Sequence, residues 1–123
     1  MIKIKNIYEM AEDDDGQRIY VELFWPEGLN TREARIDEWL PEISPSYELQ
    51  RFRSDSSEWQ KYKSHYRDEL MNDVDRRKKL EELARKSENE TITFLYGNKN
   101  PDKNHAIILK ELIEDFLINN NNH

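Results

Sequence analysis

The chain has 123 residues, 37% of them charged, and a formal net charge of −7, which fits one domain with a single core and disfavours bulk attraction to nucleic acid or to an anionic membrane. It contains no cysteine, so disulfides, thiolate nucleophiles and cysteine-ligated zinc are excluded. No apolar run approaches the roughly 20 residues that span a bilayer, and the N-terminus lacks the apolar stretch of a secretory signal, so we expect a cytoplasmic protein.

The first quarter of the chain predicts two strands. Isoleucine and lysine alternate over residues 2–8, which is typical of an edge strand with one solvated face. The acidic run at residues 12–16 indicates a solvated turn. Residues 19–25 are almost continuously apolar, which predicts a central strand that is covered on both faces. Glu22 is the polar exception in that strand, and Pro26 ends it.

A long helical stretch follows. Side-chain capping signals and helical spacing predict a helix over residues 30–40, a short helix over 44–52, a polar break at 53–57, and two further helices over 58–71 and 73–86. Trp59, Tyr62 and Tyr66 step along one face of the third helix, and helical packing toward a sheet explains this stripe better than base stacking does. A helical crossover of this length is what two parallel strands need.

The last part of the chain predicts a strand, a loop and a helix. Residues 91–96 form a β-branched and aromatic run, and Asn100 and Pro101 are a suitable cap and first position for a helix that continues to Leu117. Residues 119–123 form an asparagine-rich tail that we expect to be disordered. We therefore predict one α/β domain over residues 1–118, with a small, mainly parallel sheet of about three strands flanked by helices.

Several words of the sequence occur in an order that is typical of a known family. They are Val21 to Leu29 (VELFWPEGL), Trp39-Leu40, Ser44-Pro45-Ser46, Glu48-Leu49, Trp59, Tyr66, Glu69-Leu70, Thr93 to Tyr96 (TFLY), Asn104-His105-Ala106 and Leu109-Lys110. With these words the chain resembles DUF488, a family of unknown function, and specifically its short YeaO-like branch, over residues 2–117. The resemblance implies an α/β fold and a cytoplasmic protein, and it brings no established reaction.

The chain departs from the family at its polar positions. The family's strand word usually reads Val-Asp-Arg-Leu-Trp-Pro-Arg-Gly; here the acid is kept as Glu22, but Leu23 and Glu27 replace the two arginines. Gln50 stands where another arginine is usual, although Arg51 is adjacent, and the histidine usual before the Trp59 helix is missing. The resemblance implies that these residues form the family's anion-binding set, which this chain has mostly lost.

The turn between the last strand and helix is the place where we expect a site. In open α/β sheets, ligands bind at the carboxyl ends of the strands, where helix N-termini present backbone N–H groups. We expect ligand binding by polar and aromatic residues of this edge, with an acid–base pair if there is chemistry. The ligand-binding candidates are Trp25, Tyr96, Asn98, Lys99 and Asn104, and the candidate catalytic pair is Glu22 with His105.

Each of these residues also has a structural alternative. His105 could hold the loop through strand-end carbonyls, Asn104 could fix loop backbone, Glu22 could form a salt bridge or hydrogen bond, and Lys99 could simply be solvated. No cofactor motif is present. His65 and Glu69 lie four residues apart on one helix and could ligate a metal, but a third ligand is lacking, so we predict no metal site.

Two classes of function fit these features. The leading hypothesis is binding of a small polar or anionic ligand at the strand ends, with or without catalysis. The alternative is a protein-interaction module without catalytic activity, which predicts an apolar surface patch or a stable homodimer. Nucleic-acid binding through the basic run at residues 76–79 is disfavoured, because such a run more often forms a solvated helix face.

Overall fold

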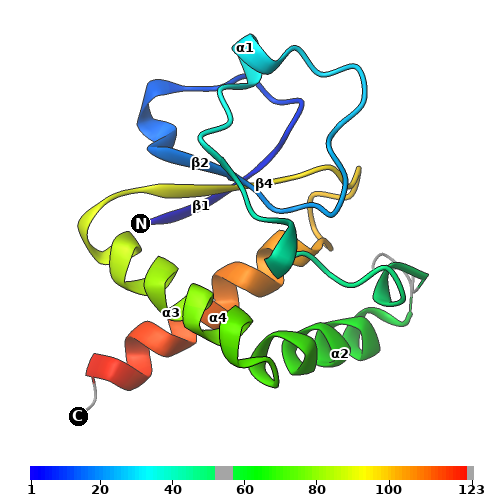
Figure 1. Ribbon diagram of the computed structural model, residues 1–123, viewed down its shortest axis with the longest axis vertical. Helices are drawn as coiled ribbons and strands as arrows, with labels where there is room; N and C mark the ends of the chain where they lie inside the picture. The colour runs from blue at the N-terminus through cyan, green and yellow to red at the C-terminus, as the bar shows by residue number, and fades with distance from the viewer. Residues whose placement is uncertain (52–56, 122–123) are drawn as a thin grey trace.

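The computed structural model describes residues 1–51 and 57–121. It shows an α/β domain in which four parallel strands form one sheet in the order β1-β4-β2-β3 (Figure 1). This confirms the predicted fold class, with one short strand more than expected. The elements are β1 (Ile2–Asn6), β2 (Gln17–Tyr20), α1 (Thr31–Ala34), β3 (Glu38–Trp39), α2 (Trp59–Met71), α3 (Val74–Asn89), β4 (Ile92–Tyr96) and α4 (His105–Asn121), with short 3-10 turns at Asp13–Asp15, Pro41–Ile43 and Leu49–Arg51.

The strand order follows from the sequence patterns. β4 is buried along its whole length and lies between β1 and β2, as a continuous apolar run predicts. The buried Thr93 in its middle donates a hydrogen bond of 2.7 Å to the backbone oxygen of Asp15. β1 is an edge strand, as its lysines indicated. Because all strand pairs are parallel, the carboxyl ends of the strands meet at one edge of the sheet.

The two faces of the sheet are covered unequally. α2, α3 and α4 gather on one face, where they enclose the larger hydrophobic core (Figure 1). The other face carries only α1 and loops, within the described residues, over a smaller core of Ile7, Tyr20, Ala34 and Leu95. Successive residues of β4 belong alternately to the two cores, since Phe94 and Tyr96 are part of the larger core and Leu95 is part of the smaller one. No helix in the described ranges is both long and apolar enough to cross a membrane.

The predicted strand over residues 19–25 is correct only for Ile19 and Tyr20, and β2 begins earlier, at Gln17. β2 ends at Tyr20, although the Val21 N–H still donates to the Leu95 oxygen at 3.1 Å. The chain then turns away from the sheet, and the Tyr20 hydroxyl donates to the Phe24 oxygen at 2.8 Å. Residues 21–25 therefore form a loop at the carboxyl edge, where aromatic side chains can reach solvent.

The predicted helix over residues 30–40 is also wrong. Asn30 caps a single turn, but Arg35 adopts a left-handed conformation with φ of 46° and ends it. The Asp37 N–H then donates to the Arg18 oxygen, and β3 pairs with β2. These contacts with β2 are tertiary, so helical spacing in the local sequence could not reveal them.

The remaining boundaries shift modestly. Of the predicted helix over 44–52, the structure shows only the turn Leu49–Arg51, and part of the predicted break lies outside the described residues. α3 continues to Asn89, through part of the expected turn at 87–90. α4 begins at His105 rather than Pro101 and continues to Asn121, so it includes most of the residues assigned to a disordered tail; Asn122 and His123 lie outside the described residues.

Candidate functional site

Glu22 and Gly97 join the ends of the two central strands. The Gly97 N–H donates a hydrogen bond of 2.6 Å to Glu22 Oε2. A methyl group at Gly97 would lie 3.3 Å from that oxygen, so the absence of a side chain allows the carboxylate to approach the backbone. The Glu22 side chain is still 21% exposed. The carboxylate is therefore fixed by backbone on one side and open to solvent on the other.

His105 is brought next to Glu22, as the sequence analysis proposed. Its Nε2 lies 3.7 Å from Glu22 Oε1 and 2.6 Å from the Val21 oxygen. A carbonyl oxygen only accepts hydrogen bonds, so Nε2 carries the proton in this contact. The imidazole packs edge-on against Tyr66, with ring centroids 6.1 Å apart, and the side chain is only 5% exposed. His105 thus ties the start of α4 to the end of β2.

Asparagines hold the loop between β4 and α4. The Asn6 side chain donates to the Asn98 oxygen at 2.7 Å, and Asn98 Oδ1 accepts from the Asn100 N–H at 2.8 Å. The buried Asn104 donates to the Asn100 oxygen at 3.0 Å and accepts from the Ile107 N–H, which caps α4. Asn104, and not Asn100, is therefore the cap of this helix. Asn100 instead accepts from the N–H groups of Asp102 and Lys103.

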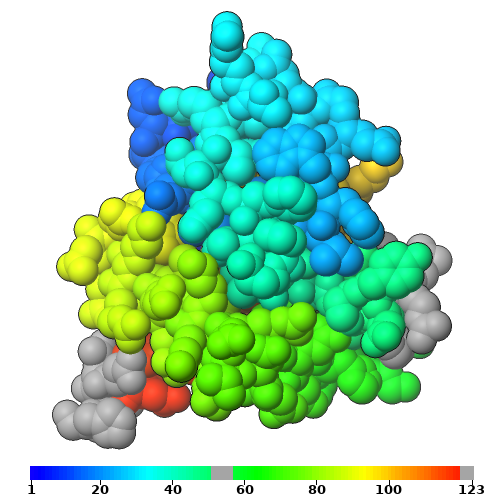
Figure 2. Space-filling view, in the orientation of Figure 1, coloured from blue at the N-terminus to red at the C-terminus, as the bar shows by residue number. Residues whose placement is uncertain are grey.

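An open pocket of about 270 Å³ lies beside Glu22. Its walls are mainly apolar and aromatic side chains, and Glu22 is the one charged residue among the described residues of the lining. The lining residues are Ile7, Tyr8, Tyr20, Glu22, Leu23, Phe24, Trp25, Pro26, Gln50 and Gly97. We call this the strand-end pocket. Figure 2 shows the segment that supplies residues 20–27, in blue, at the surface of the molecule.

The sequence predictions identified part of this pocket. Glu22 and Trp25 line it, whereas Tyr96 is buried in the larger core and the exposed Lys99 is not a lining residue. Tyr8 and Phe24 were missed because both were assigned to strands instead of loops. Both are large aromatic residues that follow a strand by two to four residues and lie close to a proline or an acidic turn.

Neighbouring aromatic rings meet at steep angles beside the pocket. The centroids of Tyr20 and Trp25 are 6.0 Å apart with the rings inclined at 74°, and those of Trp25 and Trp39 are 5.3 Å apart at 66°. The Trp39 Nε1–H donates to the Glu22 backbone oxygen at 2.7 Å, which fixes this group to the loop. Burial raises the pKa of the Tyr20 phenol, and the negative charge of Glu22 raises it further. The carboxylate therefore acts directly on the aromatic wall.

A second, larger groove of about 740 Å³ opens on the thinly covered face of the sheet. It lies between the loop at residues 7–11 and the α1 segment at residues 28–35. Its charged lining residues, among those the structure describes, are Glu9, Glu33 and Arg35, and the last of these pairs with Asp13 at 3.2 Å. The groove lies beside the short α1, on the face where only α1 and loops cover the smaller core within the described residues.

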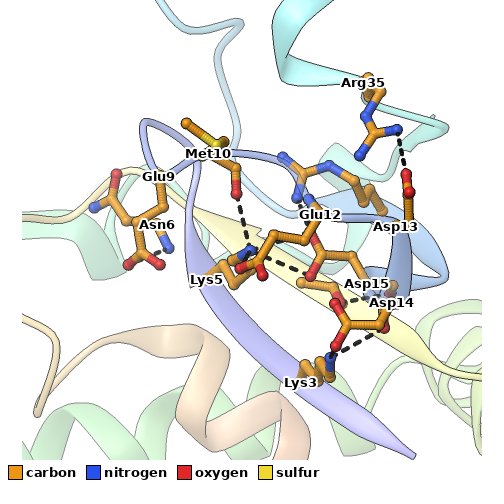
Figure 3. Close-up of polar contacts among 12 residues, drawn as sticks. Lys3, Lys5, Asn6, Glu9, Met10, Glu12, Asp13, Asp14, Asp15 and Arg35 are labelled. Atoms are coloured by element: carbon orange, nitrogen blue, oxygen red, sulfur yellow. Dashed lines mark hydrogen bonds and ion pairs between the residues drawn. The ribbon is translucent and has the colours of Figure 1, made fainter.

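The acidic run at residues 12–15 is not simply a solvated turn. Asp15 is buried and accepts hydrogen bonds from Arg18 at 2.6 Å, from Lys5 at 3.2 Å and from the Glu12 N–H at 3.0 Å (Figure 3). Lys5 also reaches Glu12 at 2.9 Å. The cluster joins β1, the acidic turn and β2, so its role is structural. Within residues 1–51 and 57–121, no three acidic or histidine side chains are placed to bind a metal ion.

Comparison with known proteins identifies relatives over nearly the whole chain. The family model described as the inactive DUF488-N3 subclade matches residues 1–123. The uncharacterized protein YeaO of Escherichia coli (strain K12) is 35% identical over 111 residues, covering 89% of this chain and 94% of its own. The uncharacterized protein Rv3073c of Mycobacterium tuberculosis (strain H37Rv) is 26% identical over 113 residues, covering 91% and 92%. No solved structure matches the chain significantly.

Proposed function

Because the chain belongs to the DUF488 family, in its inactive DUF488-N3 subclade, we propose that it is a non-catalytic domain that binds a small polar ligand in the strand-end pocket. The observation that carries this proposal is the position of Glu22. Its carboxylate is held by the Gly97 N–H, remains partly exposed and lines a pocket to which four aromatic residues also contribute. Polar groups at the carboxyl ends of parallel strands are typical of ligand sites in open α/β sheets.

The surroundings of His105 argue for binding without chemistry. A general base or acid must reach the substrate within hydrogen-bond distance. His105 is nearly buried, does not line the pocket, and already donates its Nε2 proton to the Val21 oxygen. Proton exchange with a ligand in the pocket would require this contact to break. The description of the subclade as inactive agrees with that interpretation.

The lining favours a neutral or positively charged ligand over an anion. Among the side chains that the structure describes, those of residues 1–50 and 57–119, no lysine, arginine or histidine lines the pocket. Leu23, which stands where the family usually has an arginine, is itself a lining residue, and Lys99 is not. A carboxylate without a facing cation repels anions. We also propose a cytoplasmic location, because a chain without cysteine fits a reducing compartment.

A protein-interaction module is the second candidate function. It is favoured by one observation, namely that Tyr8, Phe24, Trp25 and Trp39 are all exposed around the carboxyl edge of the sheet. Exposed aromatic groups are common at interfaces. Light scattering coupled to size-exclusion chromatography distinguishes the two proposals, since a dimer that is lost in Trp39→Ala would favour the module. Trp39 suits this test because it is exposed but does not line the pocket.

A thermal-shift screen of small amines, amino acids, sugars, nucleosides and anions tests the ligand proposal. A compound at about 100 times its Kd should stabilise the folded state by roughly 2.7 kcal/mol, which raises Tm by several degrees for a domain of this size. The shift should vanish in Phe24→Ala and persist in Tyr47→Ala, because Phe24 lines the pocket whereas the similarly exposed Tyr47 does not. A shift that survives in Phe24→Ala, or no shift with any compound, would contradict the proposal.

A further inference from the structure

We propose that the strand-end pocket recognises a small organic cation, a quaternary ammonium or guanidinium compound, through its aromatic walls and the Glu22 carboxylate. This inference rests on the proposed function and names the chemical class of its ligand. It starts from the composition of the lining. In the described part of the chain, four aromatic residues surround a single carboxylate, and no basic side chain is present. The four are Tyr8, Tyr20, Phe24 and Trp25.

Aromatic rings attract cations because the face of each ring carries partial negative charge. Tyr20 and Trp25 stand at 74° to each other, so they form a corner and not a flat stack, in which Trp25 is the exposed ring and Tyr20 is nearly buried. Tyr8 and Phe24 are exposed beside them. A corner of aromatic walls can contact a compact cation from several sides, whereas a flat stack offers one face. The arrangement thus suits an ammonium or guanidinium group better than a planar neutral ring.

Glu22 adds a full negative charge to this corner. One of its oxygens accepts the Gly97 N–H, and the ionisable side chain that lies within ion-pair distance of the other is His105, at 3.7 Å. That imidazole is buried and donates to the Val21 oxygen, so it lies behind the pocket. Burial raises the pKa of the Tyr20 phenol, and the negative charge of the Glu22 carboxylate raises that pKa further. The carboxylate therefore makes the potential at the pocket negative.

The size of the pocket limits the ligand. At about 270 Å³ it lies just below the range of roughly 300–1,000 Å³ that is typical of sites for drug-sized molecules. A head group with a few carbon atoms around one charge fits this volume. We therefore assign the site to small cations that are free in solution.

Amide NMR titration of the full chain tests this inference. The probes are tetramethylammonium chloride and, well below denaturing concentration, guanidinium chloride; sodium chloride at equal ionic strength and the neutral, similarly shaped tert-butanol serve as references. We expect saturable shifts of the Gly97 amide and the Trp25 indole N–H with at least one cation and none with either reference. Equal shifts with tert-butanol, or only linear shifts that match sodium chloride, would overturn the inference.

Charge-removing variants complete the test. Glu22→Gln keeps an oxygen that can accept the Gly97 N–H and removes the charge, so the cation should bind about tenfold more weakly. The matched control is Glu90→Gln, at the opposite end of β4 from the pocket, which should leave the affinity unchanged. Phe24→Ala provides a second variant that does not depend on the carboxylate. Unchanged affinity in both pocket variants would also overturn the inference.

The two proposals fail in different ways. If a neutral compound from the thermal-shift screen binds at Gly97 and Trp25 while both cations do not, the pocket remains a ligand site and the cation assignment is wrong. If no compound of any charge perturbs these resonances or raises Tm, the proposed function itself is wrong.

Discussion

His105 occupies a position between the last helix and the end of β2. Its imidazole donates to the buried Val21 oxygen and packs on Tyr66, whose hydroxyl in turn donates to the Ile43 oxygen. The residue therefore links α4, β2 and the turn before α2. This is the structural alternative that the sequence allowed for a histidine at the start of a helix, and it can be tested separately from ligand binding.

His105→Ala should lower the free energy of unfolding by about 1–3 kcal/mol, because it leaves the Val21 oxygen without its donor in the interior. The exposed His65 provides the matched control, and His65→Ala should change stability by less than about 0.5 kcal/mol. Urea denaturation followed by tryptophan fluorescence measures both values. A His105→Ala protein as stable as the parent would show that the imidazole is not a structural tie.

Among the described acidic residues that form ion pairs, Asp15 has the most buried side chain. Burial alone would raise the pKa of its carboxyl, but the hydrogen bond from the Glu12 N–H and those from Lys5 and Arg18 lower the pKa below its ordinary value of 3.8. Its loss would leave the Arg18 guanidinium buried, with Nη2 already lacking a partner among the described residues.

Asp15→Ala should therefore destabilise the fold by about 3–5 kcal/mol, the usual cost of leaving a buried charge unpaired. Asp14→Ala is the control, since Asp14 is exposed and pairs with Lys3 at the surface; it should cost less than about 1 kcal/mol. Guanidinium denaturation curves at pH 7 give both differences. Similar losses in the two variants would contradict a special role for the buried pair.

The lowered pKa of Asp15 also predicts a dependence of stability on pH. A carboxyl with a lowered pKa in the folded state contributes fully above its unfolded pKa, and the contribution is lost as the pH falls through the folded value. The stability difference between the parent and Asp15→Asn should thus be constant above pH 3.8 and shrink below it. Denaturation curves over a series of acidic pH values would reveal this; a difference that grows on acidification would have the wrong sign.

At the scale of elements, patterns in the local sequence correctly predicted the long and regular helices and strands. β1, β4, α2 and α3 follow from alternation, helical spacing and caps in their own sequences. The segment from 21 to 40 did not, because its course depends on partners far away in sequence. Arg35 takes a left-handed conformation, and the backbone of Asp37 pairs with Arg18. Apolar residues that looked like one strand and one helix instead form a loop, a single turn and a short strand.

Gly16 shows how strongly one turn can depend on a tertiary contact. Its φ is +64°, and a methyl group there would lie 2.2 Å from the backbone oxygen of Thr91. Gly28 has a similar φ of +67° but open space around it, which makes it a matched control. Gly28→Ala should cost about 1–2 kcal/mol from the left-handed conformation alone, and Gly16→Ala clearly more. Thermal unfolding of both variants measures the difference, and equal losses would contradict the close approach of Gly16 to Thr91.

Like the secondary structure, the candidate site could be predicted from the sequence only in part. The rule that ligands bind at the carboxyl ends of parallel strands selected Glu22, His105 and Trp25; the structure places the first two 3.7 Å apart, and Glu22 and Trp25 line the pocket. It could not indicate which side chains of the loops face the pocket. Lys99 does not line it, whereas Tyr8 does, because loop direction depends on contacts such as the bond from the Tyr8 hydroxyl to the Glu27 oxygen.

At the scale of the whole molecule, the unequal cover of the sheet is the main feature. α2, α3 and α4 bury the larger core, whereas α1 and the loops around it cover the smaller one. Regions with few buried apolar contacts open more readily than the core of the same protein. The strand-end pocket lies beside the smaller core, since its lining includes Ile7 and Tyr20 of that core together with the loop after β2.

Hydrogen exchange should follow this asymmetry. Amides of residues 26–36 should exchange well before those of α3, α4 and β4, with β4 among the slowest. A time course followed by mass spectrometry on peptic peptides provides the comparison. Uniform protection of both faces would show that the smaller core is as stable as the larger one.

The most direct test of the central claim is an amide chemical-shift map of the chain with the compound that stabilises it most in the thermal-shift screen, recorded together with a check of the compound for turnover. We predict perturbations centred on Gly97 and Trp25, with the compound recovered unchanged. Perturbations centred on the groove between Met10 and Leu29, or conversion of the compound to a product that is lost in His105→Ala, would contradict the assignment of a non-catalytic binding site beside Glu22.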